Sequence, residues 1–198
     1  VLAGFNFSMH FLAWRRRSLK VYLGDPESKA YVIALVAACV VVGVFLLNRG
    51  VYPDWQTSFR YAVFNVVSVA TTTGYASTDY NQWPTFAPIL MLFLCGFATC
   101  AGSTGGGIKM IRGLVLLKQA RREMSRIVHP RAVNPIIIGE QVIENKVIFA
   151  VLAFMLVYGA ALTSLTFLMM LLGLDAITAF TAIVACLNNM GPGLNVVG

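Results

Sequence analysis

The chain has 198 residues, of which 58% are hydrophobic and only 12% are charged, and its mean hydropathy is +0.75. Soluble domains usually carry about 25% charged residues, so this composition excludes an ordinary soluble domain and indicates an integral membrane protein. The net charge of +7 does not point to nucleic acid, because Lys and Arg lie between long apolar runs, where they set membrane topology. The first residue is Val1 rather than Met, so we expect a fragment of a longer chain.

The first half of the chain predicts one spanning helix followed by a re-entrant loop. Residues 1–29 mix aromatic and basic residues and are expected to be a cytoplasmic linker that contains the tail of an earlier helix. Residues 30–47 are unbroken apolar sequence, close to the ~20 helical residues that cross a membrane. A shorter apolar helix over 58–70, with Asp54 and Thr57 suited to cap it, then leads into Thr and Gly residues. Irregular backbone at membrane depth must line water or be buried in protein, so this order predicts a pore loop.

The second half predicts a broken helix and a second pore loop. Residues 85–101 are apolar until glycines interrupt them, and basic residues then accompany the apolar ones, which predicts a helix whose second part reaches the cytoplasm. A polar, basic connecting loop is expected over 128–146, followed by a spanning helix over 147–174. Asp175 is suited to cap a short helix over 176–187, after which Asn, Gly and Pro residues make another turn.

The two pore loops belong to a repeat with a displacement of 117 residues. The displacement matches three features, namely Gly74 with Gly191, 30–47 with 147–164, and 59–70 with 176–187. Self-similarity at a fixed displacement is typical of repeat architectures. We therefore divide the chain into a complete unit, 30–127, and a unit over 147–198 that lacks its closing helix. Lys and Arg concentrate in 15–29 and 109–146, which places both segments in the cytoplasm and both pore loops outside.

Each pore loop carries a short string of residues suited to coordinate an ion. The first string is Thr71-Thr72-Thr73-Gly74-Tyr75, in which the glycine permits unusual backbone angles, so that successive carbonyls can point one way. Rings of such carbonyls can replace the hydration shell of potassium. The second string, at the matching place in the other unit, is Asn188-Asn189-Met190-Gly191-Pro192-Gly193.

The two strings resemble the third and fourth repeats of the Trk/Ktr/HKT family of cation transporters, as does the sequence Gly102-Ser103-Thr104-Gly105-Gly106-Gly107-Ile108-Lys109 between them. The resemblance covers nearly the whole chain. It implies an all-α membrane protein in which four helix–pore loop–helix units surround one pseudo-fourfold pore, and it implies potassium uptake. The filter residues that it implies are Thr72, Thr73, Gly74, Tyr75, Asn189, Met190, Gly191 and Pro192, with the potassium ion held at Thr72, Thr73, Asn189 and Met190. Both strings depart from the potassium-channel sequence TVGYG, which leaves selectivity against sodium open.

The same resemblance makes the glycine run a gate beneath the filter. The gate residues that it implies are Gly102, Ser103, Thr104, Gly105, Gly106, Gly107 and Lys109. A phosphate-binding P-loop is disfavoured, because Ile108 follows Gly107 where that motif requires Lys. A purely structural kink is the other alternative for the run. For Lys109 we favour an anchor at lipid headgroups, with repulsion of cations at a closed gate as the alternative.

The resemblance further implies a bacterial inner-membrane protein that contacts lipid, forms a homodimer and docks a cytoplasmic nucleotide-binding regulatory ring. Potassium is the transported ion, and neither an organic cofactor nor nucleic acid is expected. A competing function is an ion-coupled secondary transporter whose substrate site is the broken helix at Gly102–Gly107. Such transporters usually carry ionisable residues within their spans, and the predicted spans contain none. We expect no enzyme activity, because His10 and His129 lie in basic cytoplasmic segments, away from membrane depth.

Overall fold

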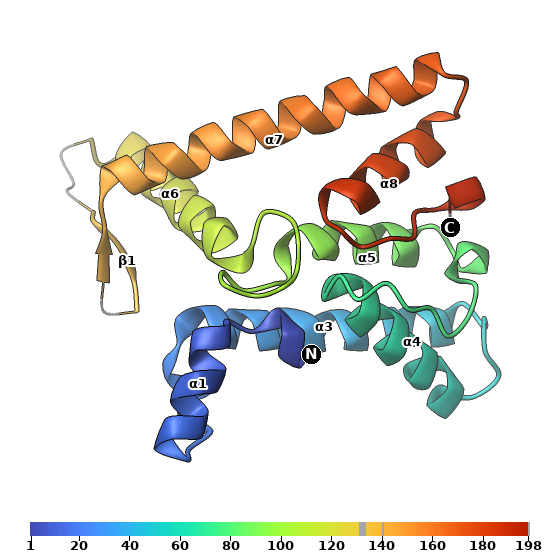
Figure 1. The fold of residues 1–198 in the computed structure, drawn as a ribbon, viewed down its shortest axis with the longest axis horizontal. Helices are drawn as coiled ribbons and strands as arrows, with labels where there is room; N and C mark the ends of the chain where they lie inside the picture. The colour runs from blue at the N-terminus through green and yellow to red at the C-terminus, as the bar shows by residue number, and fades with distance from the viewer. Residues whose placement is uncertain (131–133, 140, 198) are drawn as a thin grey trace.

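The computed structural model describes residues 1–130, 134–139 and 141–197 and is mainly helical, as Figure 1 shows. Its α-helices are α1 (Phe7–Arg16), α2 (Lys20–Gly24), α3 (Pro26–Asn48), α4 (Trp55–Ala70), α5 (Phe86–Phe97), α6 (Met110–Val128), α7 (Asn145–Leu171) and α8 (Ala176–Leu187). Short 3-10 turns lie at Leu2–Gly4, Tyr80–Gln82 and Asn195–Val197. The helical architecture predicted from the sequence is confirmed.

Two of these helices are long and apolar enough to cross a membrane, α3 with 23 residues and α7 with 27 residues. At about 1.5 Å per residue they measure roughly 35 and 40 Å, more than the hydrocarbon core of about 30 Å. α5 has 12 residues and, at about 18 Å, cannot cross alone. The apolar run predicted over 85–101 is therefore helical over a shorter stretch, because the helix ends at Phe97.

One apolar core joins the two units of the repeat. Within it, Leu46 of α3 packs with Val66 of α4 and Met91 of α5, and Val184 of α8 joins from the other unit. All four side chains are at least nine-tenths buried, and α8 reaches α4 through α5, which packs against both helices. The two pore loops, which leave the ends of α4 and α8, are held in place by the same core.

α7 lies along the edge of the molecule, away from most of this core (Figure 1). Two of its residues, Ile148 and Val151, are buried, whereas Phe149, Leu156 and Leu171 are 69%, 74% and 83% exposed. Apolar surface of this extent is suited to contact with lipid or protein rather than water. The composition of the exposed face therefore agrees with the membrane environment that the sequence predicts.

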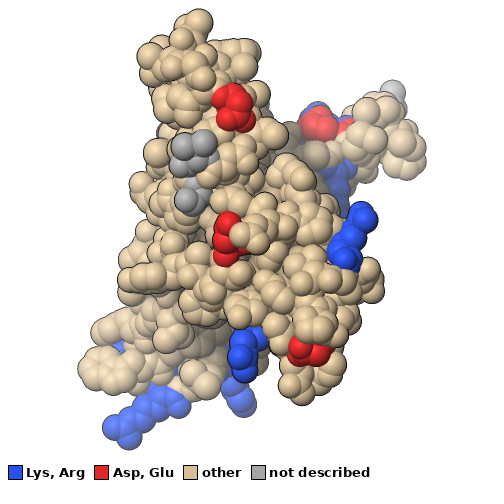
Figure 2. Space-filling model, turned by 90° about the vertical axis from the view of Figure 1, so that its right-hand side faces the viewer, with Lys and Arg blue, Asp and Glu red and all other residues tan. Residues whose placement is uncertain are grey.

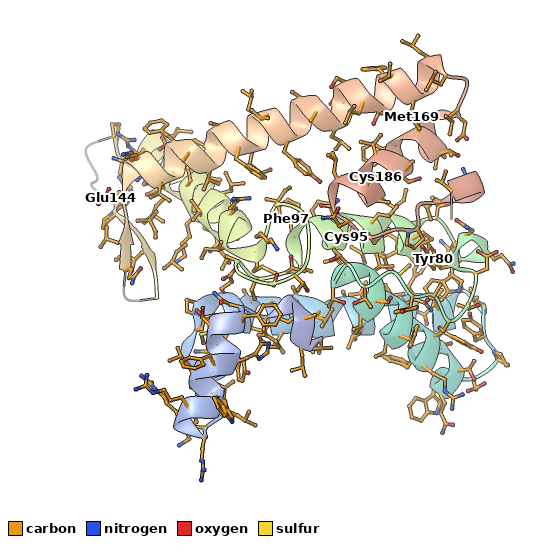
Figure 3. All side chains as sticks on the ribbon, viewed as in Figure 1. Tyr80, Cys95, Phe97, Glu144, Met169 and Cys186 are labelled. Carbon is orange, nitrogen blue, oxygen red and sulfur yellow. The ribbon has the colours of Figure 1, made fainter. Side chains whose placement is uncertain are left out.

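α3 and α7 run in the same direction, as a parallel repeat requires (Figure 1). In Figure 3, Glu144 lies beside the hairpin just before α7 begins, and Met169 lies near the other end, where α8 follows. Figure 2 looks onto this second end, where charged side chains form only scattered patches on a largely uncharged surface. In the sequence, the segments at this end, 49–84 and 172–198, carry only Arg49 and Arg60, which agrees with the predicted outer face.

The predicted connecting loop over 128–146 contains a β-hairpin that the sequence reading missed. Strand β1 (Ile136–Ile138) pairs antiparallel with β2 (Gln141–Ile143). Ile136 and Ile138 are buried against Val115 of α6 and Ile148 of α7, which gives the strand an apolar face to cover. Helix α6 ends at Val128, the first residue of the predicted loop. Residues 131–133 and 140 of the predicted loop lie outside the described residues.

Both short helices begin at the aspartates predicted to cap them. The carboxylate of Asp54 accepts a hydrogen bond of 2.8 Å from the amide of Thr57, and that of Asp175 accepts one of 3.1 Å from the amide of Thr178. Each bond satisfies an amide that the first helical turn leaves without a partner. The identical Asp-x-x-Thr pattern explains why two helices 121 residues apart at their starts have the same N-terminal geometry.

These capping bonds predict a loss of stability in acid. The hydrogen bond from the Thr57 amide lowers the pKa of Asp54 from its usual value of 3.8, and the hydroxyl of Thr178 is the main cause that lowers the pKa of Asp175. Because the folded pKa is the lower one, the stabilisation is complete above the unfolded pKa and disappears as the pH falls through the folded pKa.

The double variant Asp54→Asn, Asp175→Asn keeps the capping oxygens but cannot titrate. Between about pH 5 and pH 3 the unfolding temperature of the parent protein should therefore fall further than that of the variant. Thermal unfolding in detergent across this range measures the difference. Parallel losses in the two proteins would show that the caps do not contribute to acid sensitivity.

Candidate functional site

The two strings leave their helices with the same unusual backbone angles. Thr72 and Asn189, which are 117 residues apart, have φ values of 54° and 53°. Gly74 and Gly191, at the same displacement, have φ values of 80° and 99°. Positive φ is uncommon for a residue other than glycine, so its occurrence at both matching positions indicates one backbone design used twice.

Backbone hydrogen bonds repeat in the same register. In the first unit Thr71, Thr72 and Thr73 donate their amides to the carbonyls of Val67, Val69 and Ser68 at 3.0, 3.0 and 2.8 Å. In the second unit Asn188, Asn189 and Met190 donate to the carbonyls of Val184, Cys186 and Ala185 at 3.1, 3.2 and 2.9 Å. Each partner lies 117 residues from its counterpart. The repeat inferred from sequence therefore extends to the individual bonds that close α4 and α8.

The two strings approach each other through backbone atoms. A Cβ atom built on Gly74 would lie 2.3 Å from the carbonyl oxygen of Met190 and 3.5 Å from Cδ of Pro192. The first distance is far below van der Waals contact, so only glycine fits there. Of the predicted filter residues, the structure thus brings Gly74, Met190 and Pro192 together, while the Tyr75 side chain is 72% exposed.

A buried amide side chain, that of Asn65, binds the chain segment that follows the first string. Asn65 of α4 is fully buried and donates to the carbonyl of Tyr61 at 2.8 Å and to the hydroxyl of Ser77 at 3.0 Å. Its carbonyl oxygen accepts from the amide of Ser77 at 3.2 Å. The two bonds to Ser77 tie the chain after the first string back to α4. No distinct signal in the sequence marks this role, because α4 carries several other polar residues.

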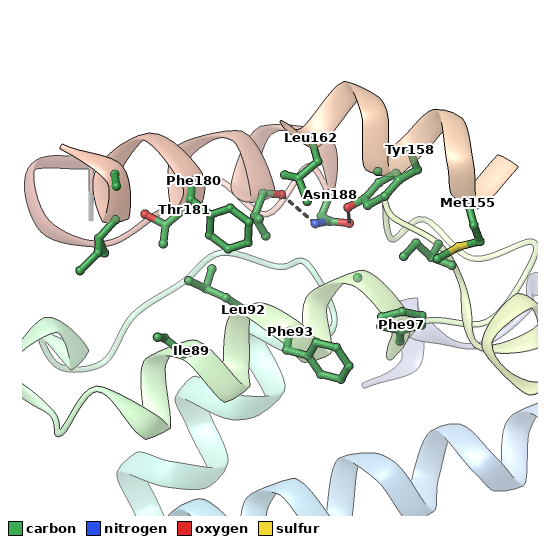
Figure 4. Close-up of a pocket in the computed structure, with 16 residues that line it drawn as sticks. Ile89, Leu92, Phe93, Phe97, Met155, Tyr158, Leu162, Phe180, Thr181 and Asn188 are labelled. Atoms are coloured by element: carbon green, nitrogen blue, oxygen red, sulfur yellow. Dashed lines mark hydrogen bonds between the residues drawn. The ribbon is translucent and has the colours of Figure 1, made fainter. Parts of the chain in front are cut away.

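The glycine loop, residues 98–109 between α5 and α6, lies against the second string. A Cβ atom on Gly106 would lie 2.1 Å from the carbonyl oxygen of Asn188, and one on Gly107 would lie 2.3 Å from its side-chain oxygen. Asn188 is itself held by Tyr158 of α7, whose hydroxyl donates to the same side-chain oxygen at 3.1 Å (Figure 4), and by its own bond to the Val184 carbonyl at 2.7 Å. The predicted gate and the predicted filter are thus in direct contact.

The break in the helix is closed by hydrogen bonds across the glycine loop. The carbonyl of Gly96, near the end of α5, accepts from the amide of Ile108 at 2.7 Å, and the carbonyl of Thr99 accepts from Met110 at 2.7 Å. The last carbonyls of a helix have no partner within it, and here the returning chain satisfies that of Gly96. The loop is therefore a folded element rather than an open linker.

Lys109 holds the loop from its C-terminal side. Its ammonium group donates to the hydroxyl of Ser103 at 3.2 Å and to the carbonyl of Ser103 at 3.4 Å, and it also contacts the carbonyl of Gly105. The backbone of Lys109 has a φ of 76°, which turns the side chain over the loop. The anchor at lipid headgroups favoured from the sequence is therefore wrong, because the ammonium group is bound to loop oxygens.

An apolar pocket of about 600 Å³ lies between α5, α7 and α8, beside Tyr158 and Asn188 (Figure 4). Its walls include Phe93, Phe97 and Phe180. Such a lining suits hydrocarbon rather than an ion. The pocket is therefore not a candidate site for a cation.

Comparison with known proteins places these features in a family. A family model described as TrkH, a cation transport protein, matches residues 1–195. The Trk system potassium uptake protein TrkH of Salmonella typhimurium is 39% identical over 197 residues, which cover 100% of this chain and 41% of that protein. TrkG of Escherichia coli is 32% identical over 195 residues, 98% of this chain and 40% of that protein.

Structural comparison agrees. The crystal structure of the potassium transporter TrkH from Vibrio parahaemolyticus matches with a TM-score of 0.94 and 38% identity, covering 100% of this chain and 42% of that one. The chain therefore spans about two fifths of the length of these relatives. The prediction of an all-α membrane protein with two pore-loop units, the second truncated, is confirmed. On its sequence and its fold, the chain belongs to the TrkH family of cation transport proteins.

Proposed function

We propose that the protein containing this chain takes up potassium through a filter of backbone carbonyls, gated by the glycine loop. The observation that carries the proposal is the repetition of positive φ angles and of backbone hydrogen bonds at matching positions of the two strings. Two loops with the same geometry, whose backbones touch at Gly74 and Met190, supply two matching portions of one ring. The relatives described above are named potassium uptake proteins.

The potassium ion is coordinated by carbonyl oxygens of Thr72, Thr73, Asn189 and Met190. Carbonyl rings compensate the ion for its lost hydration shell. α4 and α8 end directly before these residues, so the negative ends of both helix dipoles face the ion and favour a cation. Tyr75, Gly191 and Pro192 complete the two filter portions.

The gate is the run Gly102–Gly107, closed by Lys109. The loop lies against Asn188 at the base of the second string, where it obstructs the path of an ion leaving the filter. The Lys109 ammonium group, bound to loop oxygens, holds this arrangement and adds a positive charge that repels cations. Opening requires those bonds to break.

The proposed setting is the bacterial inner membrane, with lipid against α7. We further propose that the whole protein forms a homodimer and binds a cytoplasmic nucleotide-binding regulatory ring. α6 and the β-hairpin lie at the end of the molecule that faces the cytoplasm in this orientation, and α6 carries the basic residues Lys118, Arg121, Arg122 and Arg126. That surface is suited to such a partner.

Potassium flux through the full-length protein in liposomes separates a pore from an ion-coupled transporter. A potassium gradient is imposed with no proton or sodium gradient. A pore passes potassium under these conditions, whereas an ion-coupled transporter with its site at Gly102–Gly107 stays inactive until the coupling gradient is added. Flux that appears only with the second gradient would overturn the proposal.

Removing the ammonium group of Lys109 is expected to raise potassium flux. Lys109→Ala deletes the bonds that hold Ser103 and Gly105 in place, and loss of one charged hydrogen bond shifts a two-state equilibrium by about tenfold. The measurement is flux per protein in liposomes, with Lys146→Ala as control, because Lys146 is an exposed lysine in the first turn of α7, outside the loop. An equal flux in both variants would show that Lys109 does not close the gate.

A further inference from the structure

Glu27 is a buried carboxylate to which the sequence reading gave no role. It is the second residue of α3, and its side chain is 7% exposed. The carboxylate of Asp25 caps the same helix by accepting a hydrogen bond of 2.7 Å from the amide of Ser28. Glu27 is therefore not needed to cap α3. The positive end of the α3 dipole lies at this position and stabilises the negative charge.

One oxygen of Glu27 accepts two backbone hydrogen bonds from opposite sides of the glycine run. The amide of Ala101, which precedes the run, lies at 2.7 Å from Oε1. The amide of Ile111, in the first turn of α6, lies at 3.0 Å from the same atom. Because both donors meet at one atom, the carboxylate fixes the distance between the two ends of the segment that contains Gly102–Gly107.

The structure explains why α6 needs this carboxylate. Lys109 occupies the N-cap position of α6 but makes no capping bond with its side chain. The first amides of a helix have no partner within it and carry the positive end of its dipole. Met110 donates to the carbonyl of Thr99, and Ile111 donates to Glu27. Glu27 thus caps α6 from a different helix.

The preceding side of the loop is anchored to the same region of α3. Ala98 and Cys100 are buried in a cluster with Tyr31 and Leu35 of α3. The amide of Cys100 also donates to the carbonyl of Gly4 at 2.8 Å. Met110, the first residue of α6, packs against the same cluster, so both ends of the loop lie against α3, and Glu27 is the side chain that bonds to both.

We propose that Glu27 is a positioning residue that ties both ends of the gate to α3 and thereby stabilises its closed conformation. The inference rests on the proposed function of the glycine run as a gate. Opening moves α6 away from α3 and breaks the bond to Ile111, while the Ala101 side stays in place. α3 of the first unit thereby sets how readily the loop under the second string opens.

The test is potassium flux and potassium-over-sodium selectivity of the full-length protein in liposomes, for Glu27→Ala, Glu27→Gln and the control Glu144→Ala. Glu144 is an exposed glutamate at the start of α7 that makes no capping bond. Glu27→Ala is expected to raise flux about tenfold, the effect of losing one charged hydrogen bond, with selectivity unchanged. Gln keeps an acceptor oxygen of weaker strength, so its flux should lie between those of the parent and the Ala variant. Glu144→Ala should match the parent.

If Glu27 served only folding, Glu27→Ala would lower flux, and Glu27→Gln would not show a flux increase between those of the parent and the Ala variant. If Glu27→Ala does not accumulate, Glu27→Asp replaces it, because Asp keeps the charge and shortens the reach. Raised flux in that variant supports the inference and parental flux overturns it. Raised flux for Lys109→Ala but parental flux for the Glu27 variants would overturn the role of Glu27, while the proposal that the glycine run is a gate would still hold. Parental flux for all of them would overturn the gate itself.

Discussion

Gly74→Ala in the full-length protein is expected to lower potassium uptake by about two orders of magnitude. The substitution forces alanine into a backbone conformation with φ of 80° and places its Cβ atom 2.3 Å from the carbonyl oxygen of Met190. The conformational penalty is about 1 kcal/mol, and overpacking typically adds about 1–3 kcal/mol. Because the two strings touch here, both must move. Uptake at low external potassium should fall by about 100-fold, which is roughly 2.7 kcal/mol, in cells without other potassium systems.

Gly50→Ala is the matched control for this variant. Gly50 has a φ of 65°, and a Cβ atom on it meets nothing within 4 Å. It carries a similar backbone penalty but lies in the turn after α3, outside both strings. Its uptake should stay close to that of the parent protein, with a small loss of thermal stability. Equal losses of uptake in the two variants would mean that backbone strain, not contact between the strings, is responsible.

Gly106→Ala is expected to raise potassium flux by displacing the gate. Its Cβ atom would lie 2.1 Å from the carbonyl oxygen of Asn188, so one of the two elements must move. Asn188 is buried and bonded to Val184 and Tyr158, whereas the loop is rich in glycine, so the loop is the element that yields. Flux in liposomes should increase about tenfold, since an overpacking cost of about 1.4 kcal/mol destabilises the closed state by that factor.

The ratio of potassium to sodium flux distinguishes movement of the loop from damage to the filter. If the loop alone moves, Gly106→Ala keeps the parental ratio while total flux rises. Gly24→Ala serves as control, because a Cβ atom on Gly24, at the end of α2, meets nothing within 4 Å. Unchanged flux in Gly106→Ala would contradict the contact between the glycine loop and Asn188 in the whole protein.

The features predicted correctly from the sequence are those encoded by neighbouring residues. Apolar runs and the aspartate caps at Asp54 and Asp175 gave the spanning and short helices, because each depends on contacts within one or two turns. The repeat that relates Gly74 to Gly191 could also be found from the sequence, because it needs only a comparison of one part of the sequence with another. The structure extends that displacement to φ values and hydrogen bonds.

The features that the sequence did not reveal depend on residues far apart in the chain. Glu27 is separated by 74 residues from Ala101 and by 84 from Ile111, and no local pattern links them. Tyr158 reaches Asn188 across 30 residues for the same reason. The hairpin at Ile136 was hidden because its strands are three residues long and gain their stability from α6 and α7. Tertiary packing decided each of these cases.

The central claim is that the two strings together hold the transported ion. The most direct measurement is anomalous diffraction from crystals of the full-length protein grown in rubidium, which replaces potassium and can be located by its signal. We predict ion peaks among the carbonyl oxygens of Thr72, Thr73, Asn189 and Met190. Peaks confined to the broken helix at Gly102–Gly107, with none between the strings, would contradict the claim and favour a transporter with its substrate site in that loop.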